Sequence, residues 1–148
     1  MAESSTHPAS LKLVLIDDHD AARDALVRRL NADRRIAVVG ATPHLPEARR
    51  LVVEHEPHVA LVDTRRRDDA GLDVITMLVA LAERARPIVV VHTSFFDAED
   101  WHRSRAAGAH EWLLKQIDVD VLFDRLWLAV REHLPPSRWM QDAHARNA

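Results

Sequence analysis

The chain has 148 residues, of which 47% are hydrophobic and 29% charged, and these values are typical of one soluble globular domain. The formal net charge of −3 argues against a general nucleic-acid-binding surface, which would be basic, and the absence of cysteine excludes disulfides and thiolate metal sites. No apolar run reaches the roughly 18 residues of a membrane helix and residues 1–10 lack a signal-peptide pattern. We therefore expect a cytoplasmic protein that contacts no membrane and, as this chain alone, binds no nucleic acid.

Short apolar runs alternate with segments of helical periodicity along the chain. The apolar runs predict five strands, at Lys12–Ile16, Ile36–Val39 (closed by Gly40), Val59–Val62, Ile88–Val91 and Glu111–Leu114. The segments between and after them predict five helices, at Ala21–Leu30, Pro46–Glu54, Leu72–Arg84, from the N-cap Asp97 to Ala107, and from Asp118 or Asp120 to about His133. This alternation predicts an α/β fold, a doubly wound five-stranded parallel sheet with helices on both faces.

The ends of the chain are predicted to lie outside the folded domain. We expect a disordered N-terminus over residues 1–10, the domain over residues 11–133, and a C-terminal tail over residues 134–148. The tail begins with Pro135 and Pro136, which cannot continue a helix, and we favour a disordered tail. The alternative is that Trp139 docks the tail on the domain.

The helices carry apolar stripes that predict their buried faces. For the third helix the stripe is Leu72, Ile75, Val79 and Ala82, and for the last helix it is Leu122, Leu126 and Val130. Beside the second stripe, Phe123 and Trp127 form a further pair, and Trp101 lies on the preceding helix. These three residues either widen the packing face or, with the fourth helix, fifth strand and fifth helix, form a homodimer or partner surface.

Polar residues follow four of the predicted strands at the point where each strand ends. Asp17 and Asp18 follow the first strand, Asp63 the third, Thr93 the fourth and Lys115 the fifth. Ligands of open parallel sheets bind beyond these carboxyl ends. An acidic pocket there can hold a hard divalent cation and accept a phosphoryl group on a carboxylate. The ordinary alternative is that the acids only form turns or cap helices, and that Lys115 and Thr93 have no joint role.

Taken together, the ordered set resembles the receiver domain of two-component response regulators over about Leu11 to His133. The matching residues are Ile16-Asp17-Asp18-His19, Asp63, Gly71-Leu72, Thr93-Ser94, Gly108-Ala109 and Trp112-Leu113-Leu114-Lys115. Val38-Val39-Gly40 is also similar to the second strand of the subfamily with helix-turn-helix output domains. The resemblance implies a flavodoxin-like sheet with strand order 2-1-3-4-5.

The same resemblance implies a mechanism for each of these residues. Asp63 would accept phosphate from a histidine kinase or phosphotransfer protein in a Mg²⁺-dependent phosphorelay that switches protein–protein contacts. Lys115 would neutralise the phosphoryl oxygens, Thr93 would donate its hydroxyl to one of them, and Trp112 would either serve as the switching aromatic or be an ordinary core residue. The implied Mg²⁺ ligands are Asp18 and Asp63 directly, Asp17 through water, and the backbone carbonyl of Arg65.

Two segments depart from the family pattern. Arg65-Arg66-Arg67 stands where an apolar residue and a proline are usual. It is either a solvated loop balanced by Asp68 and Asp69 or a set of guanidiniums that compete with Mg²⁺, in which case neutral replacements would tighten Mg²⁺ binding. Gln116 stands where a proline is frequent, and because a cis bond before a non-proline residue costs about 3 kcal/mol, we predict a trans bond.

Other functions remain open beside a stand-alone switch. The chain is similar to the receiver part of DNA-binding transcription regulators, although no helix-turn-helix segment is present in it. It is also consistent with an atypical receiver that a ligand or partner controls. An aspartyl phosphatase would favour an acid two residues after Asp63, where Arg65 stands. A nucleotide-binding protein is disfavoured because no glycine-rich phosphate loop follows any strand. We therefore predict a switch and not an enzyme.

Overall fold

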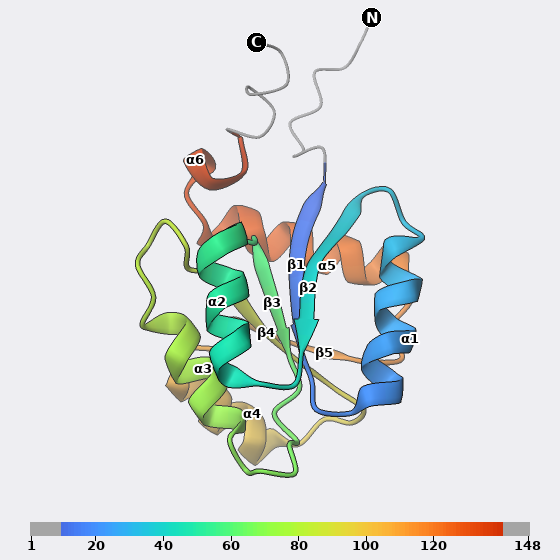
Figure 1. Ribbon diagram of the computed structural model, residues 1–148, viewed down its shortest axis with the longest axis vertical. Helices are drawn as coiled ribbons and strands as arrows, with labels where there is room; N and C mark the ends of the chain where they lie inside the picture. The colour runs from blue at the N-terminus through green and yellow to red at the C-terminus, as the bar shows by residue number, and fades with distance from the viewer. Residues whose placement is uncertain (1–9, 141–148) are drawn as a thin grey trace, which may run out of the picture.

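A parallel five-stranded sheet forms the centre of the computed structural model, which describes residues 10–140 (Figure 1). Our predictions for residues 1–9 and 141–148 lie outside the described residues. The strand order is β2-β1-β3-β4-β5, which confirms the predicted fold class and topology. The strands are β1 (Leu11–Ile16), β2 (Ile36–Thr42), β3 (Val59–Val62), β4 (Ile88–Thr93) and β5 (Glu111–Leu114).

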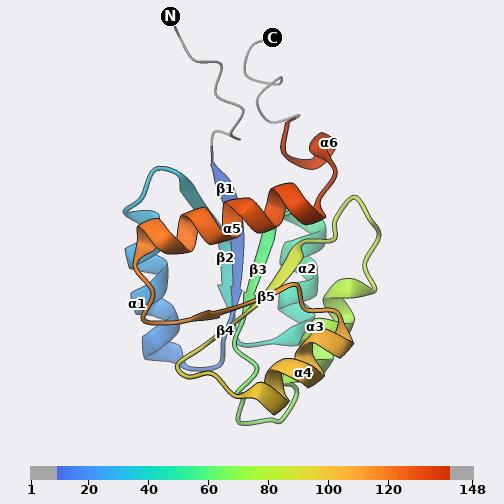
Figure 2. The same cartoon turned by 180° about the vertical axis from the view of Figure 1, so that it is seen from behind.

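Helices cover both faces of the sheet because its strands alternate apolar side chains to each side (Figures 1 and 2). One face packs against α1 (Asp20–Asn31) and α5 (Val119–His133), and the other packs against α2 (Leu45–His55), α3 (Gly71–Val79) and α4 (Ala98–Ala107). The predicted stripe of α5 is confirmed, since Leu122, Leu126 and Val130 are all buried. Among the described helices, none is both long enough and apolar enough to cross a lipid bilayer.

The third helix differs from its prediction in length and in its buried face. It ends at Val79 and not at Arg84, and residues 80–86 form turns before Pro87, which disfavours helical backbone in the residue before it. It buries Val74, Ile75 and Leu78, whereas Leu72 is 41% exposed. The reason is Gly71, where a Cβ atom would lie 2.3 Å from the Thr64 carbonyl oxygen, so that the glycine must face inward and Leu72 turns to solvent.

Two strands extend further than their apolar runs predicted. Gly40 does not end β2, which continues to Thr42 with a register shift beside Leu13 and Val14. A Cβ atom at residue 40 would lie 2.7 Å from a methyl group of Leu51, so the glycine lets α2 approach the strand closely. The strand β4 continues to Thr93, which brings that residue to the carboxyl edge of the sheet.

Our prediction of a disordered tail is wrong for residues 134–140. This segment forms the short helix α6 (Pro136–Trp139), and Trp139 packs edge-on against Trp127 with ring centroids 5.3 Å apart. The Arg138 guanidinium anchors it by donating to backbone carbonyls of Glu83, Arg86 and Pro57. Because Trp127 is only 4% exposed, it belongs to the core and not to the surface that we predicted for a homodimer.

Candidate functional site at the carboxyl edge of the sheet

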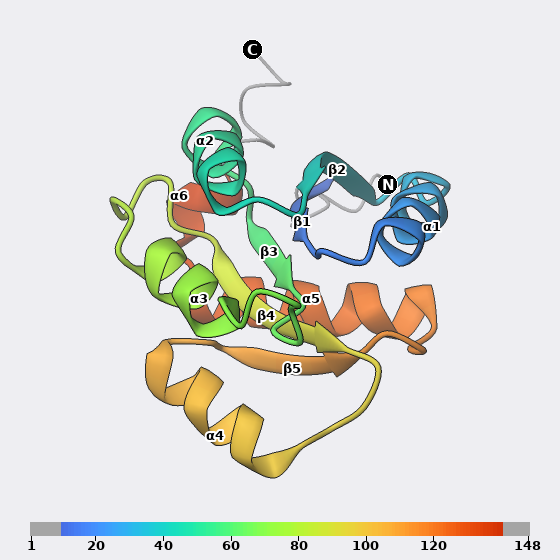
Figure 3. The same ribbon diagram turned by 60° about the horizontal axis from the view of Figure 1, so that its bottom comes forward.

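The sequence-predicted site residues meet at one edge of the sheet, where the loops after the strands come together (Figure 3). Asp17 and Asp18 directly follow β1, Asp63 directly follows β3, and Lys115 directly follows β5. Thr93 is the last residue of β4. The parallel order of the strands therefore places carboxylates and an ammonium group from distant parts of the chain side by side.

Lys115 joins two of the carboxylates. Its ammonium nitrogen donates to Asp17 Oδ2 at 2.6 Å and to Asp63 Oδ2 at 2.7 Å. Burial opposes ionisation of Asp17, but hydrogen bonds from Lys115 and His19 outweigh it and hold the pKa of this carboxyl below its usual range. Burial likewise lowers the pKa of Lys115, but its hydrogen bonds to Asp17 and Asp63 outweigh this effect and raise the pKa above its ordinary value. Asp17 and Lys115 are thus both ionised at neutral pH.

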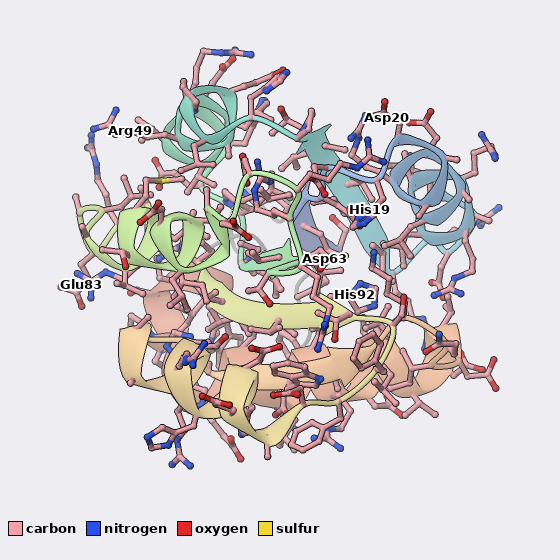
Figure 4. All side chains as sticks on the ribbon, turned by 90° about the horizontal axis from the view of Figure 1, so that it is seen from below. His19, Asp20, Arg49, Asp63, Glu83 and His92 are labelled. Carbon is pink, nitrogen blue, oxygen red and sulfur yellow. The ribbon has the colours of Figure 1, made fainter. Side chains whose placement is uncertain are left out.

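A histidine that the sequence analysis assigned no role lies among the acids. His19 Nδ1 is 2.8 Å from Asp17 Oδ1, 3.3 Å from Asp18 Oδ1 and 3.4 Å from Asp63 Oδ2. Figure 4 shows its ring beside Asp63. The only sequence feature that pointed to it was its position directly after the two acids, at the N-cap of α1.

The donor atoms suit a hard divalent cation. Single ligand atoms of Asp17, Asp18 and His19 lie within 4.8 Å of one another. Asp18 Oδ2 accepts a hydrogen bond from the Arg67 backbone N–H, whereas Asp18 Oδ1 is buried and has no hydrogen-bond partner among residues 10–140. An unsatisfied carboxylate oxygen beside two further carboxylates is the chemistry that Mg²⁺ prefers. The His19 ring occupies the approach to this oxygen and would have to turn away.

The loop after Asp63 wraps its backbone around the carboxylate and sends its arginines elsewhere. The Arg65 N–H donates to Asp63 Oδ1 at 2.8 Å. The Arg65 guanidinium donates to Asp100 Oδ2 at 3.0 Å and lies 3.7 Å from the centroid of the Phe95 ring. These contacts direct the Arg65 side chain toward α4 and away from the acids.

Arg66 is buried and does not form part of a solvated loop. Its guanidinium makes two hydrogen bonds of 2.9 Å to Asp68, and it also donates to the Pro43 carbonyl at 2.6 Å. The expected balance by Asp68 is therefore present for this residue, and the arginine links the loop to the segment before α2. The Arg65 and Arg66 guanidiniums make these hydrogen bonds outside the three carboxylates. The charge of Arg66 still acts on Asp18 and Asp17. The Lys115–Gln116 bond is trans as predicted, since residues 10–140 contain no cis peptide.

Thr93 and Trp112, which were predicted to change position on phosphorylation, lie at the carboxyl edge of the sheet on the side of α4. Thr93 is fully buried, and its hydroxyl donates to the Phe95 carbonyl at 2.9 Å. Trp112 is 9% exposed and packs edge-on between Phe96 and Trp101, at centroid distances of 5.4 and 5.8 Å. Both residues are thus linked to the loop before α4, and their role in switching stays a prediction.

The sheet order and the position of the acidic pocket together define a flavodoxin-like α/β protein with its polar site beyond the carboxyl ends of the strands. The chain belongs to the response regulator receiver domain family, whose model matches residues 13–127. The family assignment confirms the resemblance found in the sequence.

Relatives of this chain are regulators. It is 33% identical over 105 residues to the transcriptional regulatory protein LiaR of Bacillus subtilis, covering 71% of this chain and 49% of LiaR. It is 32% identical over 107 residues to the DNA-binding transcriptional activator DevR/DosR of Mycobacterium tuberculosis, covering 72% and 48%. The chain therefore spans about half the length of these curated relatives. Among solved structures, the receiver domain of NarL from Mycobacterium tuberculosis matches with a TM-score of 0.68 and 25% identity, covering 80% of this chain and 98% of that domain.

Proposed function

We propose that Asp63 accepts a phosphoryl group from a histidine kinase or phosphotransfer protein in a Mg²⁺-dependent phosphorelay. The observation that carries this proposal is the position of Asp63, buried and 2.7 Å from the Lys115 ammonium that also holds Asp17. Membership of the receiver family supports it. A carboxylate held between a cation and two further acids is positioned for attack on phosphorus and for binding of a metal.

In the transfer step, an Asp63 oxygen forms a bond to phosphorus while the bond from phosphorus to the donor nitrogen breaks. Lys115 neutralises the charge on the transferred oxygens, and Thr93 exchanges the Phe95 carbonyl for one of these oxygens as its hydrogen-bond acceptor. When bound, Mg²⁺ supplies positive charge at the same oxygens. Asp18, Asp63 and the Arg65 carbonyl would hold it, with Asp17 acting through water.

The decisive test is incubation with acetyl phosphate and Mg²⁺ followed by intact mass spectrometry. The wild type should gain the mass of one phosphoryl group, and Asp63→Ala should gain none. Asp73→Ala removes an exposed acid of α3 and serves as the matched control, which should behave as the wild type. Labelling of Asp63→Ala, or no labelling of the wild type, would overturn the proposal.

We infer that this receiver is part of a transcription regulator and controls its DNA binding. The support is its similarity to two transcription regulators of which it spans about half. The genomic reading frame provides the test. A frame that continues into a helix-turn-helix segment would support this inference, whereas a frame that ends at Ala148 would leave the stand-alone switch that acts on a partner protein.

Phosphorylation would be read on the α4 and β5 side of the molecule. Phe95 and Phe96 expose 53% and 57% of their surface on the loop before α4, and they contact Arg65 and Trp112 respectively. A change at Thr93 would therefore move exposed rings that can contact a second copy of the chain or another partner. Sedimentation with and without a phosphoryl mimic tests the homodimer. A mass that is independent of protein concentration in both states would exclude it.

A further inference from the structure

A cavity of about 180 Å³ lies beside the acidic pocket, between α1 and the carboxyl ends of β4 and β5. Its lining residues are Ala22, Ala25, Leu26, Arg29, His92 and Lys115. His92 lies near the carboxyl end of β4 (Figure 4). For scale, an apolar cavity of about 150 Å³ in another protein holds one benzene molecule.

The cavity exists because short side chains on the partly exposed face of α1 leave room between this helix and the sheet. The lining residues of α1 are spaced as one face of a helix, and two of them, Ala22 and Ala25, carry only a methyl group. Opposite them, Ile88 and Val90 point into the core from β4, and His92 continues the same alternation. His92 therefore lines the cavity from the sheet side, at a strand position where the alternation would place an apolar residue.

His92 is buried, and one of its two ring nitrogens has no hydrogen-bond partner within residues 10–140. It is 2% exposed, and its Nε2 atom has no hydrogen-bond partner among the residues that the structure describes. Burial, together with the charges of Lys115 and Arg29, lowers the pKa of His92 to about 4, so the ring is neutral at pH 7. A neutral imidazole offers one donor and one acceptor, and leaving the buried Nε2 atom unpaired is unfavourable.

The charged residues that line the cavity are both positive, although the Asp17 carboxylate also acts on His92 from the acidic pocket. Arg29 and Lys115 are its charged lining residues, and no acid is among them. Lys115 directs two of its three N–H donors to Asp17 and Asp63, which leaves the third for another acceptor. The cavity thus combines two cations and a neutral imidazole with an apolar wall of Ala22, Ala25 and Leu26.

We propose that this cavity binds a small organic carboxylate with a compact apolar body, of about the size of benzoate. The carboxylate lies toward Arg29 and Lys115, and the body packs against the alanines and Leu26. Binding does not require phosphorylation of Asp63 and stands independently of that function. Because the carboxylate shares Lys115 with Asp63, binding at the cavity and chemistry at the acidic pocket are reciprocally linked.

Titration of the ¹⁵N-labelled protein with sodium benzoate, followed by NMR at the His92 ring and the Ala25 amide, tests the proposal. We expect saturable shifts with a dissociation constant in the low millimolar range. Benzamide, a neutral molecule of the same shape, should bind more weakly by about tenfold, because it lacks the charge-assisted hydrogen bonds.

Two pairs of variants locate the binding site. Ala25→Leu fills the cavity and should abolish the shifts, whereas Ala21→Leu adds the same group to an exposed position of α1 outside the cavity and should retain them. Arg29→Gln should weaken benzoate binding about tenfold, and Arg28→Gln, on the adjacent exposed residue, should not.

Several results would overturn the proposal. They are the absence of a saturable shift at His92, equal affinity for benzamide, and unchanged affinity in Ala25→Leu. If Ala25→Leu does not fold, the two arginine variants decide, since equal affinities of Arg29→Gln and Arg28→Gln place the ligand elsewhere.

Discussion

The acidic pocket has two neighbours of opposite character. On its α4 side, the Arg65 guanidinium joins Asp100 and Phe95, and the Thr93 hydroxyl is bonded to the same loop through the Phe95 carbonyl. On its α1 side, alanines and a buried histidine leave a cavity of about 180 Å³. One side is filled with rings and directed hydrogen bonds, and the other is hollow.

This difference follows from the way successive side chains of β4 point to opposite faces of the sheet. His92 and Thr93 are consecutive in β4, so their side chains point to opposite faces of the sheet. Thr93 therefore connects the pocket to the loop before α4, whereas His92 faces the cavity beside α1. Lys115 contributes to both neighbourhoods, since it binds Asp17 and Asp63 and also lines the cavity. The pocket is thus tightly packed toward α4 and has free volume toward α1.

The largest effect is expected for Lys115→Met, which removes the group shared by both sides. Loss of the cation leaves Asp17 and Asp63 to repel each other and removes charge neutralisation during transfer. Phosphorylation by acetyl phosphate should slow by roughly a hundredfold or more, as measured by mass spectrometry over time. Lys12→Met is the matched control, since Lys12 donates to the His55 carbonyl and does not contact the pocket. A rate within a few-fold of the wild type would show that Lys115 only holds the acids together.

The second effect concerns stability on the hollow side. Because folding depresses the pKa of His92 from 6.5 to about 4, the unfolded chain binds a proton that the folded chain does not bind within this window. The free energy of unfolding should therefore fall as the pH drops from about 6.5 to about 4, by up to roughly 3 kcal/mol. His92→Leu should remove this part of the pH dependence in urea titrations at several pH values.

The matched control for this change is His102→Leu, at an exposed histidine of α4. A shallower slope will remain in His92→Leu, because burial and the neighbouring His133 also lower the pKa of His110. Identical slopes in the wild type and in His92→Leu would contradict a neutral, buried His92 and would remove the contrast between the two sides.

Next in size is the effect of His19, which is the N-cap of α1 and lies among the three carboxylates. Its Nδ1 atom is 3.3 Å from the unsatisfied Asp18 Oδ1, so the ring must leave before a cation can bind there. His19→Ala should tighten Mg²⁺ binding about fivefold, which corresponds to a contact worth roughly 1 kcal/mol. Isothermal titration calorimetry measures this change, with His44→Ala as the control at another exposed N-cap. Weaker binding would instead identify His19 as a supporting group of the metal site.

Local features of the sequence were sufficient to predict the strands and the residues at their ends, whereas the strand order followed only from the resemblance to receiver domains. It did not predict the depth at which side chains lie. Leu72 was predicted on the buried stripe of the third helix, but it is 41% exposed. The position of His19 depends on how the β1–α1 turn folds back over Asp63, and the docking of Trp139 depends on a partner, Trp127, that lies 12 residues earlier on α5. These contacts are set by tertiary packing, which no local pattern records.

The smallest effect tests the filled side, through a double-mutant cycle of Arg65→Gln and Asp100→Asn. Both side chains are 35% exposed, so the solvent screens their ion pair and the coupling energy should stay below about 1 kcal/mol in urea unfolding. Arg65→Lys keeps the charge but loses the planar contact with Phe95, and it should recover only part of the stability. If the coupling were zero and Arg65→Lys matched the wild type, the contacts between the Asp63 loop and α4 would carry no energy. The α4 side would then be as loosely connected to the pocket as the α1 side, and the route from Asp63 to Trp112 would have to run through Thr93 alone.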